Sequence, residues 1–274
     1  MTMRIQQGFP GVTGKTYLLL ENGDEKLERV YALEQAPEPI YLFADTELAA
    51  HQEQGPLVLC LSGSALLDEY RNAPNEWRGL LLSSPQPLEE LLAHLRRMLI
   101  VSFDDGRKAL LRYYDPRVAS YFFPACDADS VTPWLGPIQQ LIWHGGTWAD
   151  SAQGLSHWHS LSNLNGTAVT EQPLPMPLNQ QQSNALERQQ LEHFTYEWLQ
   201  GQPGVPFSLA WDYLQQGLAA SFDEADALQA YLDLRIQYPD HATNPVPPAG
   251  DTQQRLQQLR AYLEVSPTLK EPHA

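Results

Sequence analysis

The chain has 274 residues, of which 43% are hydrophobic, and this provides enough apolar surface to bury a full core. A disulfide-stapled mini-protein and a disordered tail are therefore excluded. The 17 Lys and Arg against 33 Asp and Glu give a formal net charge of −16, which opposes the approach of polyanions, so we expect no general nucleic-acid binding.

The cysteines and the absence of long apolar runs bear on the compartment. Cys60 and Cys126 lie far apart and form neither a disulfide framework nor a CxxC metal or redox pair, as expected in a reducing cytoplasm. We expect both to be buried thiols. Residues 1–9 lack the pattern of a secretion signal, and no run of about 18 apolar residues is present. A cytoplasmic protein without stable membrane association of its own is predicted.

Short apolar runs alternate with mixed or helical segments from Tyr17 to about Tyr114, which is typical of an α/β layer arrangement. The expected strands are 17–20, 40–43, 57–61, 79–82 and 99–103. Between 87 and 99, leucines recur on one helical stripe and leave His94, Arg96 and Arg97 off it. We expect this helix to pack by its leucines and to expose its basic side chains.

Asp105-Gly106 separates two strand-like segments, and a two-residue Asp-Gly link predicts a β-hairpin. A turn centred on that pair places Arg112 on the apolar face of the hairpin, which also carries Val101, Phe103 and Leu110. An unpaired guanidinium there would be costly, so Arg112 is expected to need a carboxylate partner.

Asp115 and Pro116 predict the start of the next helix, with Asp115 as N-cap and Pro116 in the first helical position. Six of the 17 basic residues fall between Arg96 and Arg117. Two interpretations remain open for this segment. Arg112 and Asp115 are expected to form a buried ion network that fixes the corner, whereas Arg96, Arg97 and Arg117 are better placed for outward contacts.

The segment 118–187 contains no Lys or Arg and is rich in Trp, Gly and Ser, and we interpret it as irregular strands and loops that close the first lobe. Alternate prolines in 171–182 favour an extended linker. The predicted organisation is an α/β lobe at 1–170, with a mixed sheet and flanking helices, followed by an all-α lobe at 183–274 with a proline-rich break at 239–250.

The second lobe has a helical period. Leu191, Phe194 and Trp198 form one stripe of a helix at 179–200, with Leu186 and Tyr196 on the far side. These two residues either face a partner or pack against the first lobe, and the sequence leaves both possibilities open. Further helices are expected over 207–218, after a capping box at 221–224, and around 256–263.

Several patterns suggest catalysis or metal binding but lack the required context. Gly8 and Gly14 enclose five residues instead of the four of a phosphate-binding loop, and a strand instead of a helix follows, so no nucleotide is expected. Ser62 and Ser64 lack the flanking glycines of a nucleophile elbow, and a helix N-cap is the preferred interpretation.

Three histidines could be imagined around a zinc ion, because His157 and His159 share one face of an extended segment and His144 is close in sequence. No carboxylate or cysteine at a familiar spacing joins them, so we expect half-buried hydrogen-bonding rings and no metal. The adjacent acids Glu89-Glu90, Asp104-Asp105 and Asp223-Glu224 fit helix starts and a turn, and no catalytic residue or cofactor is predicted.

A family resemblance is carried by the order of several motifs. A helix ending in HLRR (94–97), the Asp105-Gly106 hairpin, LLRYYDPRV (110–118) and WLGPI (134–138) together resemble a domain-of-unknown-function family encoded beside VgrG spike proteins. The resemblance covers roughly 17–143, and His94, Arg112, Tyr114, Asp115 and Pro116 belong to the shared motif. Members of that family act as type VI secretion effector chaperones or adaptors.

The resemblance implies a non-catalytic cytoplasmic protein that binds one cognate toxin effector, stabilises it and helps to load it on the VgrG spike. Partner contacts are expected at Arg96, Arg97, Arg117, Leu186 and Tyr196. Two alternatives remain open, a hydrolase that uses the Ser64 region or His157 and His159, and an immunity-type protein that binds a mature toxin.

Overall fold

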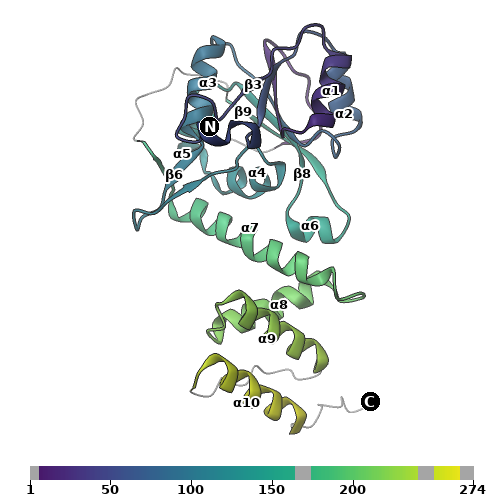
Figure 1. Cartoon of the computed structure of the whole chain (residues 1–274), viewed down its shortest axis with the longest axis vertical. Coiled ribbons are helices and arrows are strands. Elements are labelled where there is room, and N and C mark those ends of the chain that lie inside the picture. Colours follow the sequence, from purple (N-terminus) through teal and green to yellow (C-terminus); the bar gives the residue numbers. More distant parts are fainter. Residues whose placement is uncertain (1–5, 164–173, 240–249, 266–274) are drawn as a thin grey trace. The chain divides into compact units, whose positions relative to one another are not determined.

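The computed structural model of the chain describes residues 6–163, 174–239 and 250–265 (Figure 1). Contacts divide the chain into two compact units, Met1–Gln190 and Leu191–Ala274. The strands of the described residues all lie in the first unit and are β1 (Gln6–Gln7), β2 (Thr16–Leu20), β3 (Ile40–Tyr41), β4 (Leu57–Cys60), β5 (Gly79–Ser83), β6 (Ile100–Ser102), β7 (Lys108–Leu110), β8 (Gln140–Gly145), β9 (His157–Ser162) and β10 (Met176–Pro177).

Helices of the first unit are α1 (Asp24–Leu33), α2 (Ala65–Asn72), α3 (Leu88–Arg97), α4 (Pro116–Phe122), α5 (Ala128–Leu135) and α6 (Trp148–Ala152), with 3-10 turns η1 (Ala49–Gln54) and η2 (Phe123–Ala125). The boundary between the units falls inside α7 (Gln180–Leu199), and the second unit continues with α8 (Phe207–Ala219), α9 (Ala225–Gln237) and α10 (Thr252–Val265). An α/β lobe followed by helices is confirmed. None of the described helices is long and apolar enough to cross a membrane.

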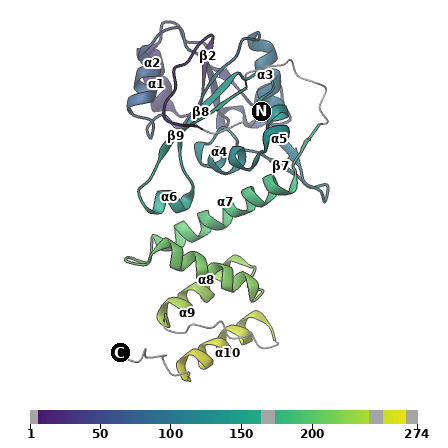
Figure 2. The same cartoon turned by 180° about the vertical axis from the view of Figure 1, so that it is seen from behind.

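A seven-stranded sheet, in the order β1-β9-β8-β5-β2-β4-β3, is antiparallel at every pairing. Side chains alternate across it: Tyr17 and Leu19 belong to one core cluster and Leu18 and Leu20 to another. The first cluster also holds residues of α3, α4 and α5, and the second holds residues of α1 and α2. Figure 2 shows these two groups of helices on opposite sides of the sheet, so both faces are covered.

The expectation of irregular structure over 118–187 is wrong, because this segment supplies two long strands. β8 lies between β5 and β9, well inside the sheet. Trp143 of β8 is fully buried, and its indole N–H donates to Ser120 Oγ at 3.0 Å. β9 reads HWHSLS, which has few residues with high strand propensity and therefore gives a weak signal in the sequence.

β6 and β7 form the predicted hairpin, but its loop has three residues and not two. Phe103 N–H donates to Arg107 O at 2.9 Å, and the loop ends in Gly106 with φ 81°, the usual form of a type I turn with a glycine bulge. Val101 is therefore opposite Ala109, and Ile100 is opposite Leu110. This shift of one residue moves Leu110 and Arg112 to the face away from Val101, contrary to our expectation.

The 171–182 segment is described from residue 174 onward, and its first residues lie outside the described part of the chain. Met176 and Pro177 form β10, which pairs parallel with Val101 and Ser102 of β6. Within the described ranges, β10, β6 and β7 thus make a second, three-stranded sheet in which β7 is the last strand.

In the second unit, α8 packs on α9 and α9 on α10 around a core that contains Tyr213, Leu214, Tyr231 and Leu232. Leu191, Phe194 and Trp198 contribute to this core as predicted. The capping box expected at 221–224 is absent from the described contacts: α9 begins at Ala225, its N-cap is Glu224, and no side chain caps it.

Candidate partner-binding site

The shared motif folds into one corner of the first unit, made by the end of α3, the β6–β7 hairpin and the start of α4. Asp115 is the N-cap of α4, and its Oδ1 accepts the backbone N–H of Arg117 at 2.9 Å. Pro116 occupies the first helical position, where its missing N–H costs nothing. Both features confirm the predicted start of this helix.

His94 lies inside this corner, and its expected exposure on α3 is wrong. The residue is 2% exposed, and its Nε2 donates to Trp134 O at 2.8 Å. Burial lowers the pKa of His94 to about 4, because a charged ring would lose its hydration. The ring also lies against Gly136, where an added Cβ would come within 2.5 Å of it. His94 therefore acts as a neutral link between α3 and α5.

Two tyrosines follow the hairpin and fix its end. Tyr113 is buried and its hydroxyl donates to Leu95 O at 2.8 Å, which ties the chain after β7 to α3. Burial raises the pKa of both Tyr113 and Tyr114. Tyr114 packs its ring edge-on against Phe43, with 6.2 Å between the ring centroids.

Arg112 is exposed, so the expected buried ion network is wrong. Its side chain is 54% exposed, and its closest Asp115 oxygen is 3.9 Å away. The guanidinium lies 5.9 Å from the centre of the Tyr114 ring. An exposed pair at this distance contributes little to stability, because water screens it. The three-residue hairpin loop explains the difference, since it turns Arg112 away from the apolar face.

The basic residues expected to point outward are mostly engaged with the protein itself. Arg96 donates from Nε to Leu42 O at 3.2 Å and pairs with Asp45 at 3.2 Å. The Arg117 guanidinium lies 3.8 Å from the centre of the Trp148 ring. Arg97 is half-buried. These three side chains are therefore less available to a partner than we expected.

Sequence reasoning missed the residues that are exposed at this corner. Lys108 is exposed, Leu110 is one of the exposed large hydrophobic residues at 39%, and Arg112 follows on the same face of the strand. The alternation of these three residues along 108–112 indicates that they share one face of a strand, but whether that face is exposed depends on the length of the hairpin loop.

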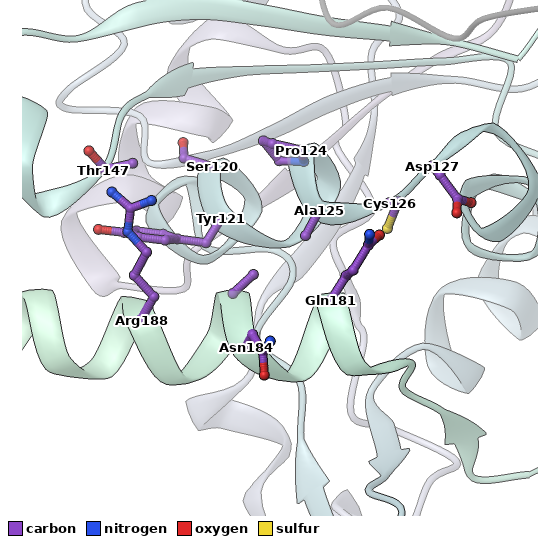
Figure 3. Close-up of a pocket in the computed structure, with 11 residues that line it drawn as sticks. Ser120, Tyr121, Pro124, Ala125, Cys126, Asp127, Thr147, Gln181, Asn184 and Arg188 are labelled. Carbon is purple, nitrogen blue, oxygen red and sulfur yellow. The ribbon is translucent and has the colours of Figure 1, made fainter. Parts of the chain in front are cut away.

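A hollow of about 600 Å³ lies beside the same α4 helix, between α4, η2, the start of α6 and the first half of α7 (Figure 3). Arg188 of α7 points toward Tyr121 and Thr147, and Gln181 points toward Cys126. Cys126 accepts a hydrogen bond from Gln182 Nε2 at 3.2 Å, and burial raises its pKa to about 11. This thiol is therefore protonated at neutral pH and is a poor nucleophile.

Leu186 of α7 packs against the larger core of the first unit, which corresponds to one of the two roles left open for it, and Tyr196 is half-buried. The expectation of two buried thiols is wrong for Cys60, which is exposed at the end of β4.

The other chemical patterns have structural roles. Ser62 Oγ donates to the Glu34 carboxylate at 2.7 Å, and Ser64 is the N-cap residue of α2, although its side chain makes no capping bond. Residues 8–15 join β1 to β2, so a strand follows the glycines. Glu89 and Glu90 lie in the first turn of α3, as predicted.

The three histidines meet on β8 and β9 but do not form a metal site. His144 is opposite Trp158, and His159 stacks on Trp143 with 5.2 Å between the ring centroids. Burial lowers the pKa of His144 and of His159. His159 Nε2 donates a hydrogen bond to Gly145 O at 3.1 Å. Among the residues that the structure describes, no group of three or more His, Cys, Asp or Glu side chains could hold a metal ion.

Residues 16–133 match a protein-family model described as "Domain of unknown function (DUF4123)". This range contains every strand from β2 to β7 and the whole of the His94–Arg117 corner. No curated protein matches the chain, and no solved structure matches it.

Proposed function

We propose that this protein is a cytoplasmic, non-catalytic adaptor that binds a cognate type VI secretion effector, stabilises it and helps to load it on the VgrG spike. The match of residues 16–133 to a domain of unknown function, DUF4123, supports this proposal, because the motifs in this range carry the resemblance to effector chaperones described above.

The observation that carries the proposal is that some residues of the motif are buried and structural, whereas others are exposed. Its buried members, such as His94 and Tyr113, bond to backbone carbonyls of α5 and α3 and thereby fix the corner. Its exposed members leave a basic and apolar face on the hairpin of a chain whose net charge is −16. A rigid corner with an exposed face of unusual charge is suited to recognising another protein.

The experiment is deletion of this gene in its native host, with the solubility and the secretion of the effector encoded beside it as readouts. We expect the effector to become insoluble or to be lost from the secreted fraction, and expression of the protein from a plasmid to restore it. Unchanged solubility and secretion would rule out the adaptor role.

A second measurement separates an adaptor from the two alternatives. The purified protein should form a complex with the effector, and the effector should keep its toxic activity after release from that complex. The purified protein by itself should have no enzymatic activity. Protection of a host cell from mature toxin, with no effect on secretion, would instead identify an immunity protein. Turnover of an ester or amide by the isolated protein, lost on Ser64→Ala, would identify a hydrolase.

A further inference from the structure

The hairpin has one edge of backbone that its own sheet does not use. Phe103 N–H donates to Arg107 O, and Leu111 N–H donates to Leu99 O at 2.7 Å. Because hydrogen-bonded and non-hydrogen-bonded pairs alternate in an antiparallel ladder, Arg107, Ala109 and Leu111 direct their backbone groups to β6. The N–H and C=O groups of Lys108 and Leu110 then point the other way. In the described part of the chain, β7 is the last strand of its sheet, so these groups have no strand beside them.

The side chains on this edge alternate between charge and apolar surface. Lys108 and Leu110 share the outer face of β7, and Arg112 continues it, whereas Leu111 on the other face is buried at 3% exposure. Leu110 is 39% exposed and Arg112 is 54% exposed. An exposed leucine between two cations is a pattern that an added strand can match residue by residue.

The neighbouring charges define which cations are available. Asp105 at the turn is paired with Arg107, so Arg107 is already neutralised. Asp115 is the nearest carboxylate to Arg112, at 3.9 Å, and Glu21 lines the same small pocket, but the Arg112 side chain is 54% exposed and its pair is weak enough to be exchanged for a better one. Lys108 makes no ion pair with the residues that the structure describes. The outer face therefore carries the free positive charge of Lys108 and the weakly paired positive charge of Arg112.

We propose that the unpaired edge of β7 captures an extended acidic–apolar–acidic segment of a partner protein as an added strand. The backbone of Lys108 and Leu110 pairs with the segment, Leu110 contacts its apolar residue, and Lys108 and Arg112 contact its two carboxylates. This inference deepens the proposed function, because it names the surface and the chemistry by which the adaptor holds its client.

Strand addition is the mode that this edge favours for three physical reasons. Main-chain hydrogen bonds supply affinity without requiring a particular sequence, and alternate side chains supply selectivity. The hairpin is held at its base by the buried Tyr113, so the edge is formed before the partner arrives and little ordering is needed. The remainder of the chain is acidic and repels an acidic segment, which directs that segment to the basic hairpin.

The first test uses a fluorescent peptide carrying Glu-Thr-Val-Thr-Glu and a second peptide with Lys in both Glu positions. We expect the full-length protein to bind the acidic peptide about tenfold more tightly, because two cross-strand charge pairs change from attractive to repulsive. Fluorescence anisotropy at near-physiological salt measures both affinities, because this salt screens the long-range attraction of the Lys peptide to the acidic chain. Equal affinity for the two peptides would overturn the proposal.

Matched variants locate the site. Lys108→Glu with Arg112→Glu should weaken binding of the acidic peptide about tenfold. The control, Lys15→Glu with Arg260→Glu, changes the net charge equally at two exposed positions away from β7 and should leave the affinity unchanged. Circular dichroism establishes that both variants are folded. Equal weakening in the two variants would show an effect of net charge alone and would contradict the assigned surface.

The backbone component is tested by hydrogen exchange. Saturation with the acidic peptide should slow exchange of the Lys108 and Leu110 amides, whereas a peptide methylated on alternate backbone nitrogens should bind at least about tenfold more weakly. Unchanged exchange at both amides in the bound state would exclude an added strand.

The effector itself separates this inference from the proposed function. If the wild-type protein forms no complex with the co-encoded effector, the adaptor role fails, and the peptide assay still decides the chemistry of the edge. If the complex forms and the Lys108→Glu, Arg112→Glu variant retains full affinity for the effector, the adaptor role stands and the inference is overturned.

Discussion

The two units differ in the atoms that a methyl group added at a tightly packed glycine would meet. In the first unit, an added Cβ at Gly79 would come within 2.2 Å of Leu19 O, and one at Gly136 would come within 2.5 Å of the His94 ring. In the second unit, an added Cβ at Gly217 would meet Leu228 Cδ1 at 2.8 Å and Tyr231 Cδ1 at 3.0 Å. Backbone and a hydrogen-bonded ring cannot move away, whereas the end of a leucine can change rotamer.

Topology accounts for this difference. The sheet of the first unit joins segments that are far apart in sequence, such as Gln6 of β1 and Ser160 of β9, and pairs them in fixed register. In the second unit, each helix from α8 to α10 packs on the next by side chains. The first unit is therefore expected to have low tolerance for a change of shape, and the second to be more adaptable.

The largest expected effect tests the rigid side of the comparison. Gly136→Ala should lower the free energy of unfolding by about 3 to 5 kcal/mol, because a residue with φ 47° becomes strained and its Cβ overlaps the buried His94 ring. Urea denaturation followed by tryptophan fluorescence measures the change.

Gly106→Ala is the matched control for backbone strain. Gly106 also has a positive φ, 81°, but an added Cβ would meet nothing within 4 Å. We expect a cost of about 1 to 2 kcal/mol from the left-handed conformation alone. Equal costs for the two substitutions would mean that the His94 ring moves aside, and the first unit would then not be rigid at this point.

The second prediction concerns the pH dependence that His94 gives to the first unit. Its pKa is 6.5 in the unfolded chain and about 4 in the folded protein. Both states are neutral above pH 6.5, so stability is complete there. Between about pH 6.5 and 4 the unfolded chain binds a proton that the folded protein does not bind. The free energy of unfolding therefore decreases as the pH is lowered through this range, by about 3 kcal/mol in total.

His94→Gln isolates this contribution, because glutamine offers a donor for Trp134 O and does not titrate. Urea denaturation at several pH values should show the stability advantage of the wild-type protein shrinking steadily below pH 6.5. A constant difference between the two proteins across this range would show that His94 binds its proton equally well in both states.

The sequence predicted well those features that depend on residues adjacent in the chain, such as short strands and a helix cap. β2 and β5 were expected within one residue of their observed bounds, because each is a short apolar run between breaks. Asp115 and Pro116 predicted the start of α4 because a cap and its helix are adjacent in the chain. The basic segment of the candidate site was likewise recognised from its composition alone.

Features that depend on distant partners were missed. His94 is buried because its Nε2 reaches Trp134 O, forty positions further along the chain, and α3 alone gives no sign of this. The polar and aromatic residues of β9 form a strand because β8 lies beside them. At the hairpin, a single extra loop residue decided which face carries Arg112, and the Asp-Gly signal does not specify it.

A smaller effect is expected at the corner, where a local cap replaces long-range packing. Asp115→Ala should lower the free energy of unfolding by about 1 to 2 kcal/mol, because the Arg117 N–H loses its acceptor. Asp115→Asn keeps that acceptor and removes only the exposed pairing with Arg112, so it should cost less than about 0.5 kcal/mol. An alanine variant as stable as the asparagine variant would show that the cap is not what stabilises this corner.

The smallest expected effect tests the adaptable side of the comparison. Gly217→Ala in α8 gains about 1 kcal/mol in helix propensity, and it loses a similar amount as Leu228 and Tyr231 shift to admit the methyl group. The free energy of unfolding should therefore change by less than about 1 kcal/mol in either direction, in contrast to Gly136→Ala. The same urea titration measures both variants. A loss at Gly217 as large as that at Gly136 would show that the helical unit is packed as rigidly as the sheet, and tolerance to a new methyl group would then not follow from topology.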